Sequence, residues 1–286
     1  MPEGDTLYRT AATLQRAIGG RVVTRFETAY AHLMVVDDQQ PIAGRLVESV
    51  TAAGKHVLMR FGARGDAGGL VLRTHMRMHG SWHIYRPGEA WRRPRAAMRV
   101  LVETDAWVAV AFDVPVAEFV AAEALARHEP LTSLGPDLLG ETFNLAEAIR
   151  RMREHGGEPM REVLLNQRVI AGIGNVYKSE TLFVARLHPD TLVEATDDET
   201  LTVVLEQARR LLLANVKPGS PAAIVTYGGM TRETGRAGRG HGLWVYGRQG
   251  LPCRRCGTTI EWRKTGIHAR STYWCPECQG RKLRIL

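Results

Sequence analysis

The spacing of apolar residues divides the chain into a strand-rich first part and a helix-rich second part. The first helix is predicted to start at Asp5 as its N-cap and to stop at Gly19-Gly20, because Leu7, Ala11, Leu14 and Ile18 recur at helical spacing. Short β-branched segments between Gly, Pro or Asp turns then predict strands at 22–26, 46–50, 56–61, 70–72, 82–85, 98–103 and 107–112. About seven short strands suggest a two-sheet sandwich.

After a polar stretch at 128–140 the period becomes helical, and helices are predicted at 145–152, 160–167, 177–185 and 200–214. Residues 217–242 contain seven glycines without a clear period, so they are predicted to form a loop. We therefore expect an α+β fold. Its parts are a β-sandwich flanked by helices over 1–127, a linker over 128–143, a helical domain over 144–245 and a terminal hairpin over 246–286.

All four cysteines belong to one pattern, in which two C-x2-C pairs are separated by eighteen residues. Two such pairs close a tetrahedral zinc site, and this spacing lies in the range of known sites. Two disulfides are the alternative, but thiols stay reduced in the cytosol, where a chain without a secretory signal is expected. Four thiolates leave no open coordination position, so one structural Zn²⁺ is predicted on Cys253, Cys256, Cys275 and Cys278. A β-hairpin is predicted between the pairs, over 258–264 and 271–274.

The net charge of +8 and the pI near 9.6 are common among nucleic-acid-binding proteins, although charge alone is weak evidence. Residues 247–286 carry nine Lys or Arg and two acidic residues, so nearly the whole excess lies around the predicted zinc site. No run of about 18 apolar residues occurs, so no membrane span is predicted. The start of the chain lacks the apolar core of a signal peptide. We expect a cytosolic, nucleoid-associated protein.

Pro2 is a candidate nucleophile, because a small second residue permits removal of the initiator methionine. The free secondary amine of an N-terminal proline can attack an electrophilic carbon and form an iminium. Glu3 is an acid beside it, and the positive end of the following helix disfavours protonation of the amine. Many chains begin Met-Pro for no catalytic reason, so this pair alone does not establish catalysis.

Three further segments carry candidate binding residues. In Ala-Gly-Ile-Gly-Asn at 171–175, two glycines allow backbone N–H groups to approach a phosphate, and Asn175 adds a donor; an ordinary helix–helix turn fits as well. Lys55 follows Gly54 at the start of a predicted strand, where most lysines are merely exposed. A turn of Arg77, Met78 and His79 is compatible with a wedge that fills a gap in base stacking, or with an unremarkable loop.

Taken in order, MPEG, the Gly-Lys at 54–55, AGIGN and RSTYWCPECQ resemble the formamidopyrimidine-DNA glycosylase and endonuclease VIII family. The resemblance covers essentially the whole chain, and AGIGNVY and the terminal cysteine block are its most specific parts. It implies that the helical domain is a helix–two-turn–helix DNA-binding domain followed by a zinc-finger hairpin. It also implies a bifunctional DNA glycosylase and AP lyase of base excision repair that acts on damaged double-stranded DNA, by family precedent as a monomer.

The resemblance assigns a role to each matching residue. Pro2 matches the nucleophile that attacks C1′ of the damaged nucleoside, and Glu3 matches the general acid that helps open the deoxyribose. Lys55, Asn175 and Arg270 match residues that contact DNA phosphates. The family flips the damaged base out of the duplex, forms a Schiff base on the proline, and cuts the strand by β- and δ-elimination.

The resemblance also favours the endonuclease VIII branch. Arg77, Met78 and His79 match by position its consecutive wedge triplet, and no Arg-Arg-Phe-Gly stretch of the formamidopyrimidine type follows 98–103. This implies a preference for oxidised pyrimidines, and MPEGDT is similar to actinobacterial members, which implies a bacterial protein. Thr6 departs from the glutamate that many members carry, so no base or sugar contact is carried over to it.

Two other interpretations stay open. One is a glycosylase of the same family directed at 8-oxoguanine or formamidopyrimidine, and incision of defined lesions would separate it from the first. The other is a non-catalytic zinc-ribbon protein whose binding of nucleic acid would not depend on Pro2 or Glu3.

Overall fold

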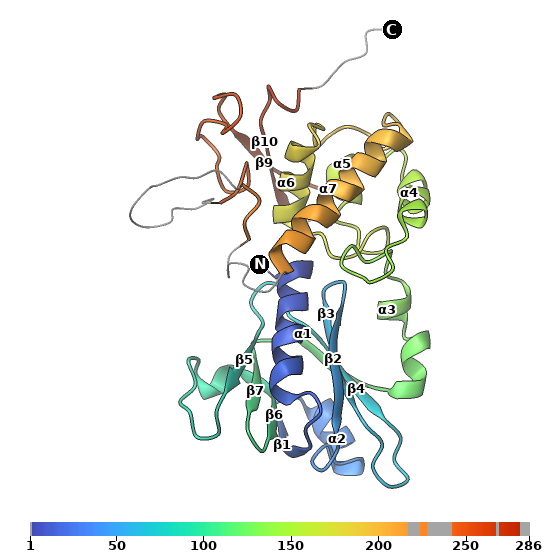
Figure 1. The fold of residues 1–286 in the computed structure, drawn as a ribbon, viewed down its shortest axis with the longest axis vertical. Helices are drawn as coiled ribbons and strands as arrows, with labels where there is room; N and C mark the ends of the chain where they lie inside the picture. The colour runs from blue at the N-terminus through green and yellow to red at the C-terminus, as the bar shows by residue number, and fades with distance from the viewer. Residues whose placement is uncertain (1, 217–223, 228–241, 267–268, 281–286) are drawn as a thin grey trace. The chain divides into compact units, whose positions relative to one another are not determined.

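The computed structural model describes residues 2–216, 224–227, 242–266 and 269–280, which Figure 1 shows in colour. The chain divides into two units, Met1–Ser133 and Leu134–Leu286. The boundary falls within the segment 128–143, which also holds a short helix, α3 (Glu129–Thr132). Most of the loop predicted over 217–242 lies outside the described residues.

Two four-stranded antiparallel sheets form the first unit, which confirms the predicted sandwich. One sheet has the order β1-β6-β7-β5, with bounds Val23–Thr28, Met98–Thr104, Val108–Phe112 and Ser81–Tyr85. The other has the order β2-β3-β4-β8, with bounds Val47–Ala53, His56–Phe61, Leu70–His75 and Val116–Ala121. Short 3-10 helices lie at Arg95–Ala97 and Ala122–Arg127.

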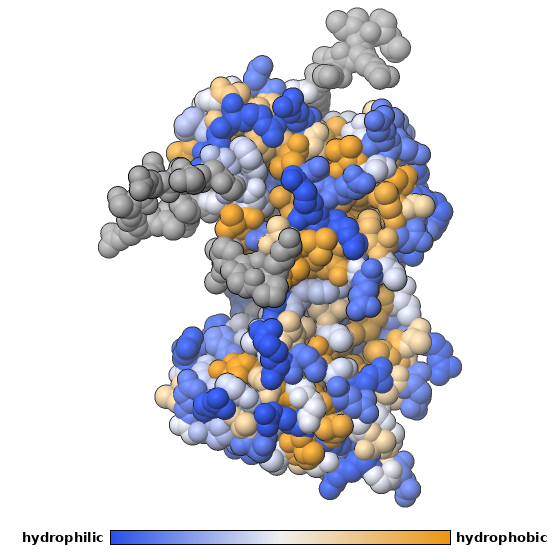
Figure 2. All heavy atoms as spheres, viewed as in Figure 1, coloured by the Kyte–Doolittle hydropathy of each residue, from blue (hydrophilic) through white to orange (hydrophobic). Residues whose placement is uncertain are grey.

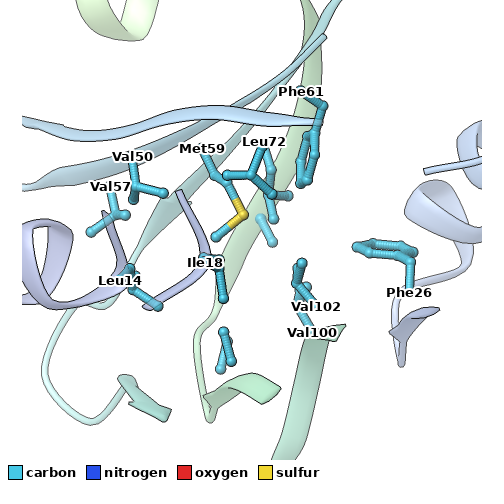
Figure 3. Packing of buried hydrophobic residues seen from close by; sticks show 14 of the residues in the cluster. Leu14, Ile18, Phe26, Val50, Val57, Met59, Phe61, Leu72, Val100 and Val102 are labelled. Atoms are coloured by element: carbon cyan, nitrogen blue, oxygen red, sulfur yellow. The ribbon is translucent and has the colours of Figure 1, made fainter. Parts of the chain in front are cut away.

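Helix α1 (Gly4–Ile18) buries its apolar face in the core of this sandwich. Leu7, Leu14 and Ile18 are at most 1% exposed. Figure 3 shows Leu14 and Ile18 among side chains from both sheets, including Met59 of β3 and Val102 of β6. Full burial of one such side chain contributes about 1.5–3 kcal/mol, so this helix is firmly held against the sheets.

The start of α1 differs from the prediction, because Glu3 and not Asp5 occupies the N-cap position. Asp5 lies in the first helical turn, where its carboxylate accepts a hydrogen bond from Arg9 at 3.1 Å. A carboxylate in the first turn of a helix interacts favourably with the helix dipole. The predicted end of the helix at Gly19 is confirmed.

Helix α2 (Ala31–Gln39) and strand β8 were not predicted. Only Leu33 of α2 is buried, while Met34 and Val35 are exposed, so no apolar period marks this helix. Strand β8 is an edge strand whose alternation is broken by a half-buried Phe119 next to Glu118. The apolar patterns of α2 and β8 therefore do not predict these elements, which are evident only from their packing in the structure.

The described part of the second unit contains four helices, namely α4 (Leu145–Arg153), α5 (Met160–Val163), α6 (Asn175–Val184) and α7 (Asp198–Val216). Three of them agree with the prediction to within about two residues, but α5 ends at Val163, four residues earlier than predicted. Gln167 lies beyond this end, where its side chain amide donates to the carbonyls of Leu165 and Ile173. The residue thus braces the turn before α6.

The terminal hairpin pairs β9 (Glu261–Thr265) with β10 (Arg270–Trp274) in antiparallel register, as predicted. It is attached to the helices by polar contacts, since the backbone N–H of Tyr273 donates to Ser179 Oγ at 3.4 Å and Arg263 pairs with Asp190. The buried carboxylate of Glu180 accepts from three successive backbone N–H groups at 2.8–2.9 Å, those of Trp244, Val245 and Tyr246.

Figure 2 shows hydrophilic and hydrophobic residues interspersed over the visible face of each unit. Within the described ranges, every helix is too short or too polar to span a bilayer.

Candidate active site and nucleic-acid interface

Pro2 and Glu3 lie directly before α1. Pro2 is partly exposed, whereas Glu3 is completely buried. The carbonyl of Glu3 accepts the backbone N–H of Leu7 at 3.1 Å, so the residue is joined to the first helical turn. A helix of 15 residues carries a partial positive charge at this end. Pro2 thus stands next to a residue with a buried carboxylate, at the positive end of the helix.

Thr6 stands where many members of the resembled family have glutamate, and its hydroxyl donates to Asp5 at 3.3 Å. Asp5 is fully buried and also pairs with Arg9. Thr6 therefore supports the charged first turn of α1 and leaves this position without a carboxylate.

Lys55 lies in the tight turn between β2 and β3, where Gly54 has a φ of 54°. Lys55 is half-buried, and its charge helps to lower the pKa of His75 at the end of β4. The His75 ring lies edge-on to the ring of His56, with 4.8 Å between centroids. The structure thus adds two histidines to the surroundings of Lys55.

The histidines are kept neutral by burial and by neighbouring cations. Burial, together with Lys55, lowers the pKa of His75 to about 4. Burial, then His75 and Arg73, lowers the pKa of His56 to about 3. The buried Arg73 donates to His56 Nδ1 at 2.9 Å. Arg73 also pairs with Glu118, and this pairing outweighs the effect of burial and lowers the pKa of Glu118.

Arg73, His56 and His75 were not singled out from the sequence. A signal for two of them exists, because Arg73 and His75 are two residues apart in an apolar strand and therefore point to the same face. His56 joins them only through the pairing of β3 with β4.

The predicted wedge residues Arg77, Met78 and His79 are all exposed on the turn between β4 and β5. Arg77 has a φ of 45°, which is uncommon for a residue other than glycine. Gly80 closes the turn, since its N–H donates to the carbonyl of Met76 at 2.9 Å and a Cβ there would lie 2.7 Å from that oxygen. A rigid turn thus presents Met78, which is 56% exposed. The wedge role itself stays a prediction.

In the second unit, Asn175 is the first residue of α6 and follows a turn in which Gly172 has a φ of 106°. The N–H of Gly172 donates to Gln167 Oε1 at 3.1 Å, which fixes the turn. Lys178 lies one helical turn later, is fully buried, and connects Asn175 to Ser271 of the hairpin. Since Ser271 follows Arg270 directly, the structure brings the neighbourhoods of Asn175 and Arg270 together.

The four cysteines form a site that fits one zinc ion. Their sulfur atoms all lie within 4.8 Å of one another. The Sγ–Sγ distances are 3.9 Å for Cys253–Cys278 and 3.4 Å for Cys256–Cys275. Tetrahedral Zn²⁺ with Zn–S bonds of about 2.3 Å needs sulfur atoms about 3.8 Å apart. Backbone N–H groups of Arg255 and Cys278 point at Cys253 and Cys275, respectively, each at 3.4 Å, which stabilises thiolates. A closed set of four thiolates gives the zinc a structural role.

Three family models match successive parts of the chain. The formamidopyrimidine-DNA glycosylase N-terminal domain matches residues 1–115, the formamidopyrimidine-DNA glycosylase H2TH domain matches 134–224, and the zinc finger found in FPG and IleRS matches 250–280. These matches define the class as a DNA glycosylase fold with a helix–two-turn–helix domain and a zinc finger.

Individual relatives show which members of this class the chain is similar to. A probable endonuclease 8 2 of Streptomyces coelicolor is 37% identical over 284 residues, which is 98% of this chain and 94% of the relative. A DNA-(apurinic or apyrimidinic site) lyase of Mycolicibacterium smegmatis is 34% identical over 98% of this chain and 99% of its own. The chain belongs to the formamidopyrimidine-DNA glycosylase and endonuclease VIII family and is similar to its actinobacterial endonuclease 8 2 members.

The fold agrees with solved structures of this family. A complex between the Lactococcus lactis Fpg and DNA that contains an abasic site superposes with a TM-score of 0.79. The match covers 98% of this chain and 100% of that one at 22% identity. At this identity the comparison establishes the fold.

Loss of one thiolate should release the zinc ion. We expect Cys275→Ser to lower the zinc content from one ion per chain to near zero after dialysis against a chelator. Zinc binding by four thiolates contributes to the folding free energy of the hairpin, and three thiolates bind the ion more weakly. Metal analysis, with Trp262→Phe on the exposed side of β9 as the control, checks this. Full zinc retention by Cys275→Ser would contradict the four-thiolate site.

The buried histidines should make the first unit less stable in mild acid. Folded His56 and His75 have pKa values of about 3 and about 4 and stay mostly neutral down to about pH 5, whereas a histidine in the unfolded chain binds a proton at about pH 6.5. Since the unfolded state then binds more protons, stability falls as the pH drops from 7 to 5. The slope is at most about 1.4 kcal/mol per pH unit for each histidine.

Urea unfolding of the first unit at pH 7, 6 and 5 measures this slope. We expect His56→Gln to reduce it, while His79→Gln leaves it unchanged, because His79 is exposed to solvent in the folded protein. Equal slopes for the wild type and His56→Gln would show that His56 is not held neutral.

Proposed function

We propose that this protein is a bifunctional DNA glycosylase and AP lyase of base excision repair that excises oxidised bases, with pyrimidines preferred, from double-stranded DNA. The observation that carries the proposal is the pair Pro2-Glu3. Pro2 stands beside a residue whose carboxylate is fully buried at the positive end of α1, in a chain that matches its relatives over 98% of its length.

The chemistry begins when removal of the initiator methionine frees the secondary amine of Pro2. Its lone pair attacks C1′, the C1′–N glycosidic bond breaks, and the base leaves with the proton that the proline nitrogen loses. Glu3 then gives its proton to O4′ as the C1′–O4′ bond opens, which leaves an iminium between Pro2 and C1′. Loss of a proton from C2′ expels the 3′ phosphate, and a second elimination expels the 5′ phosphate, so a one-nucleotide gap remains.

Binding is assigned to residues of both units. Lys55 and the neutral His75 offer donors near the reacting nucleotide in the first unit, and Asn175 and Arg270 contact phosphates in the second. Exposed Met78, with Arg77 and His79, fills the space that the flipped base leaves. The positive charge of residues 247–286 supports this role, because phosphate neutralisation releases counterions.

The preference for pyrimidines is supported by two observations. The candidate wedge residues are consecutive on a single exposed turn, and relatives that are 36–37% identical include proteins named endonuclease 8 2. We further propose that the protein acts as a monomer in the bacterial cytoplasm, associated with the nucleoid.

Borohydride reduction should trap the Schiff base on Pro2. With duplex DNA that contains an abasic site, we expect a covalent complex whose mass mapping places the DNA remnant on Pro2. Glu3→Gln should slow excision of an intact lesion by roughly 10²–10⁴-fold, the usual contribution of a general acid. Glu123→Gln, which changes an exposed carboxylate of the same unit, is the control. A remnant on a lysine, or wild-type excision by Glu3→Gln, would contradict the assignment.

A panel of defined lesions decides the substrate class. Duplexes with 5-hydroxyuracil, thymine glycol or 8-oxoguanine are incubated with the zinc-loaded protein, and incision rates are compared. We expect the two pyrimidine lesions to be incised faster. Faster incision of 8-oxoguanine would move the protein to the other branch of the family, and binding without any incision would indicate a non-catalytic protein.

A further inference from the structure

Lys178 is a buried cation in the first turns of α6. The residue is 0% exposed. An ammonium group has three N–H donors and no acceptor. Three acceptors surround Lys178 Nζ, which are Thr272 Oγ1 at 2.9 Å, the carbonyl of Ser271 at 3.0 Å and Asn175 Oδ1 at 3.4 Å. The group therefore joins the start of α6 to strand β10.

The charge of Lys178 near the N-terminal end of α6 would destabilise an isolated helix. Burial of an ammonium group is costly, and the N-terminal end of a helix already carries partial positive charge. Lys178 is the fourth residue of α6, so its charge adds to that of the helix end. Both charges favour an anion at this end of the helix, and a DNA phosphate is such an anion.

Lys178 also decides which way the carboxamide of Asn175 points. Because an ammonium cannot accept a hydrogen bond, the Asn175 atom that faces it is the oxygen, Oδ1. The NH₂ group of Asn175 is then turned away from Lys178. Asn175 is 9% exposed, and this orientation makes its NH₂ group a donor for an acceptor outside the protein.

The contacts of Lys178 with Ser271 and Thr272 affect Arg270, the other candidate for phosphate binding. These two residues follow Arg270 in β10, so the ammonium fixes the strand beside the arginine. The hairpin has other attachments, including the Tyr273 N–H to Ser179 Oγ bond and the Arg263–Asp190 ion pair. Loss of Lys178 would therefore alter the local geometry and charge while the hairpin stays attached.

We propose that Lys178 is a positioning residue for phosphate binding. It turns the Asn175 carboxamide so that its NH₂ group faces the DNA, holds β10 at Arg270, and adds one buried positive charge behind the phosphate. This inference rests on the proposed function, because it takes Asn175 and Arg270 as phosphate contacts.

The test measures the affinity of the zinc-loaded full chain for a duplex with a tetrahydrofuran abasic-site analogue at several salt concentrations. Lys178→Met keeps the length of the side chain but removes its donors and its charge. We expect affinity to fall by about 10- to 100-fold, the range for hydrogen bonds to a charged group. The salt slope should decrease by about one, and zinc content should stay at one ion per chain.

A double-mutant cycle with Asn175→Ala shows whether Lys178 acts through Asn175. We expect the fold-loss of affinity in the double variant to be smaller than the product of the two single fold-losses. In the Asn175→Ala background there is no carboxamide for Lys178 to orient, so Lys178→Met costs less there. Lys264→Met removes an exposed positive charge from β9 and serves as the control for net charge. Independent losses, or a loss in Lys264→Met as large as that in Lys178→Met, would overturn the proposal.

If Lys178→Met does not retain zinc, Thr272→Val takes its place, since it removes one acceptor and keeps the charge. Weaker binding with an unchanged salt slope is expected, and wild-type affinity would overturn the proposal. A wild-type protein that shows no salt-dependent DNA binding would instead refute the proposed function. Wild-type binding combined with an unaffected, zinc-loaded Lys178→Met would refute only the role of Lys178.

Discussion

The position of the candidate nucleophile depends on the packing of one helix. Chain ends usually fray unless they are tied down, yet the proposed chemistry needs a secondary amine that exists only at the end of the chain. Leu7, Leu14 and Ile18 bury the apolar face of α1 between the two sheets, and this burial holds the residues that precede the helix. The same helix directs its positive end at Pro2. The sandwich thus supports the segment that carries Pro2 and Glu3.

In the second unit, buried charges join distant segments of the chain in addition to an apolar core. Glu180 binds three backbone N–H groups before the zinc site, Asp190 pairs with two arginines, and Lys178 joins α6 to β10. Buried charges of this kind gain little net stability but accept only one arrangement of their partners. These charge contacts help to fix the position of the hairpin, which has a small core of its own and depends on zinc binding to fold.

Short-range patterns predicted much of this arrangement. Two C-x2-C pairs place four thiolates on two tight turns, and residues one helical turn apart share a face of α1, whatever the rest of the chain does. Short β-branched segments between turn residues likewise predicted seven of the eight strands of the first unit. The pattern missed α2 and β8, because α2 buries only Leu33 and β8 is an edge strand with a polar residue in its middle. Pro2, Glu3 and Asn175 were singled out as candidates within short motifs, because the chemistry that a side chain can perform follows from its residue type.

Which side chains these motifs act with depends on contacts between distant parts of the chain. Strand pairing brings His56 to Arg73 and His75, and it is this burial among cations that keeps the histidines neutral. Lys178 is three residues from Asn175 in the sequence, but its partner Thr272 is 94 residues further along. A lysine at that helical position would be solvated if the hairpin were not docked over it. The sequence determined the chemistry of each group, and the fold determined its charge state and orientation, because both depend on burial by distant residues.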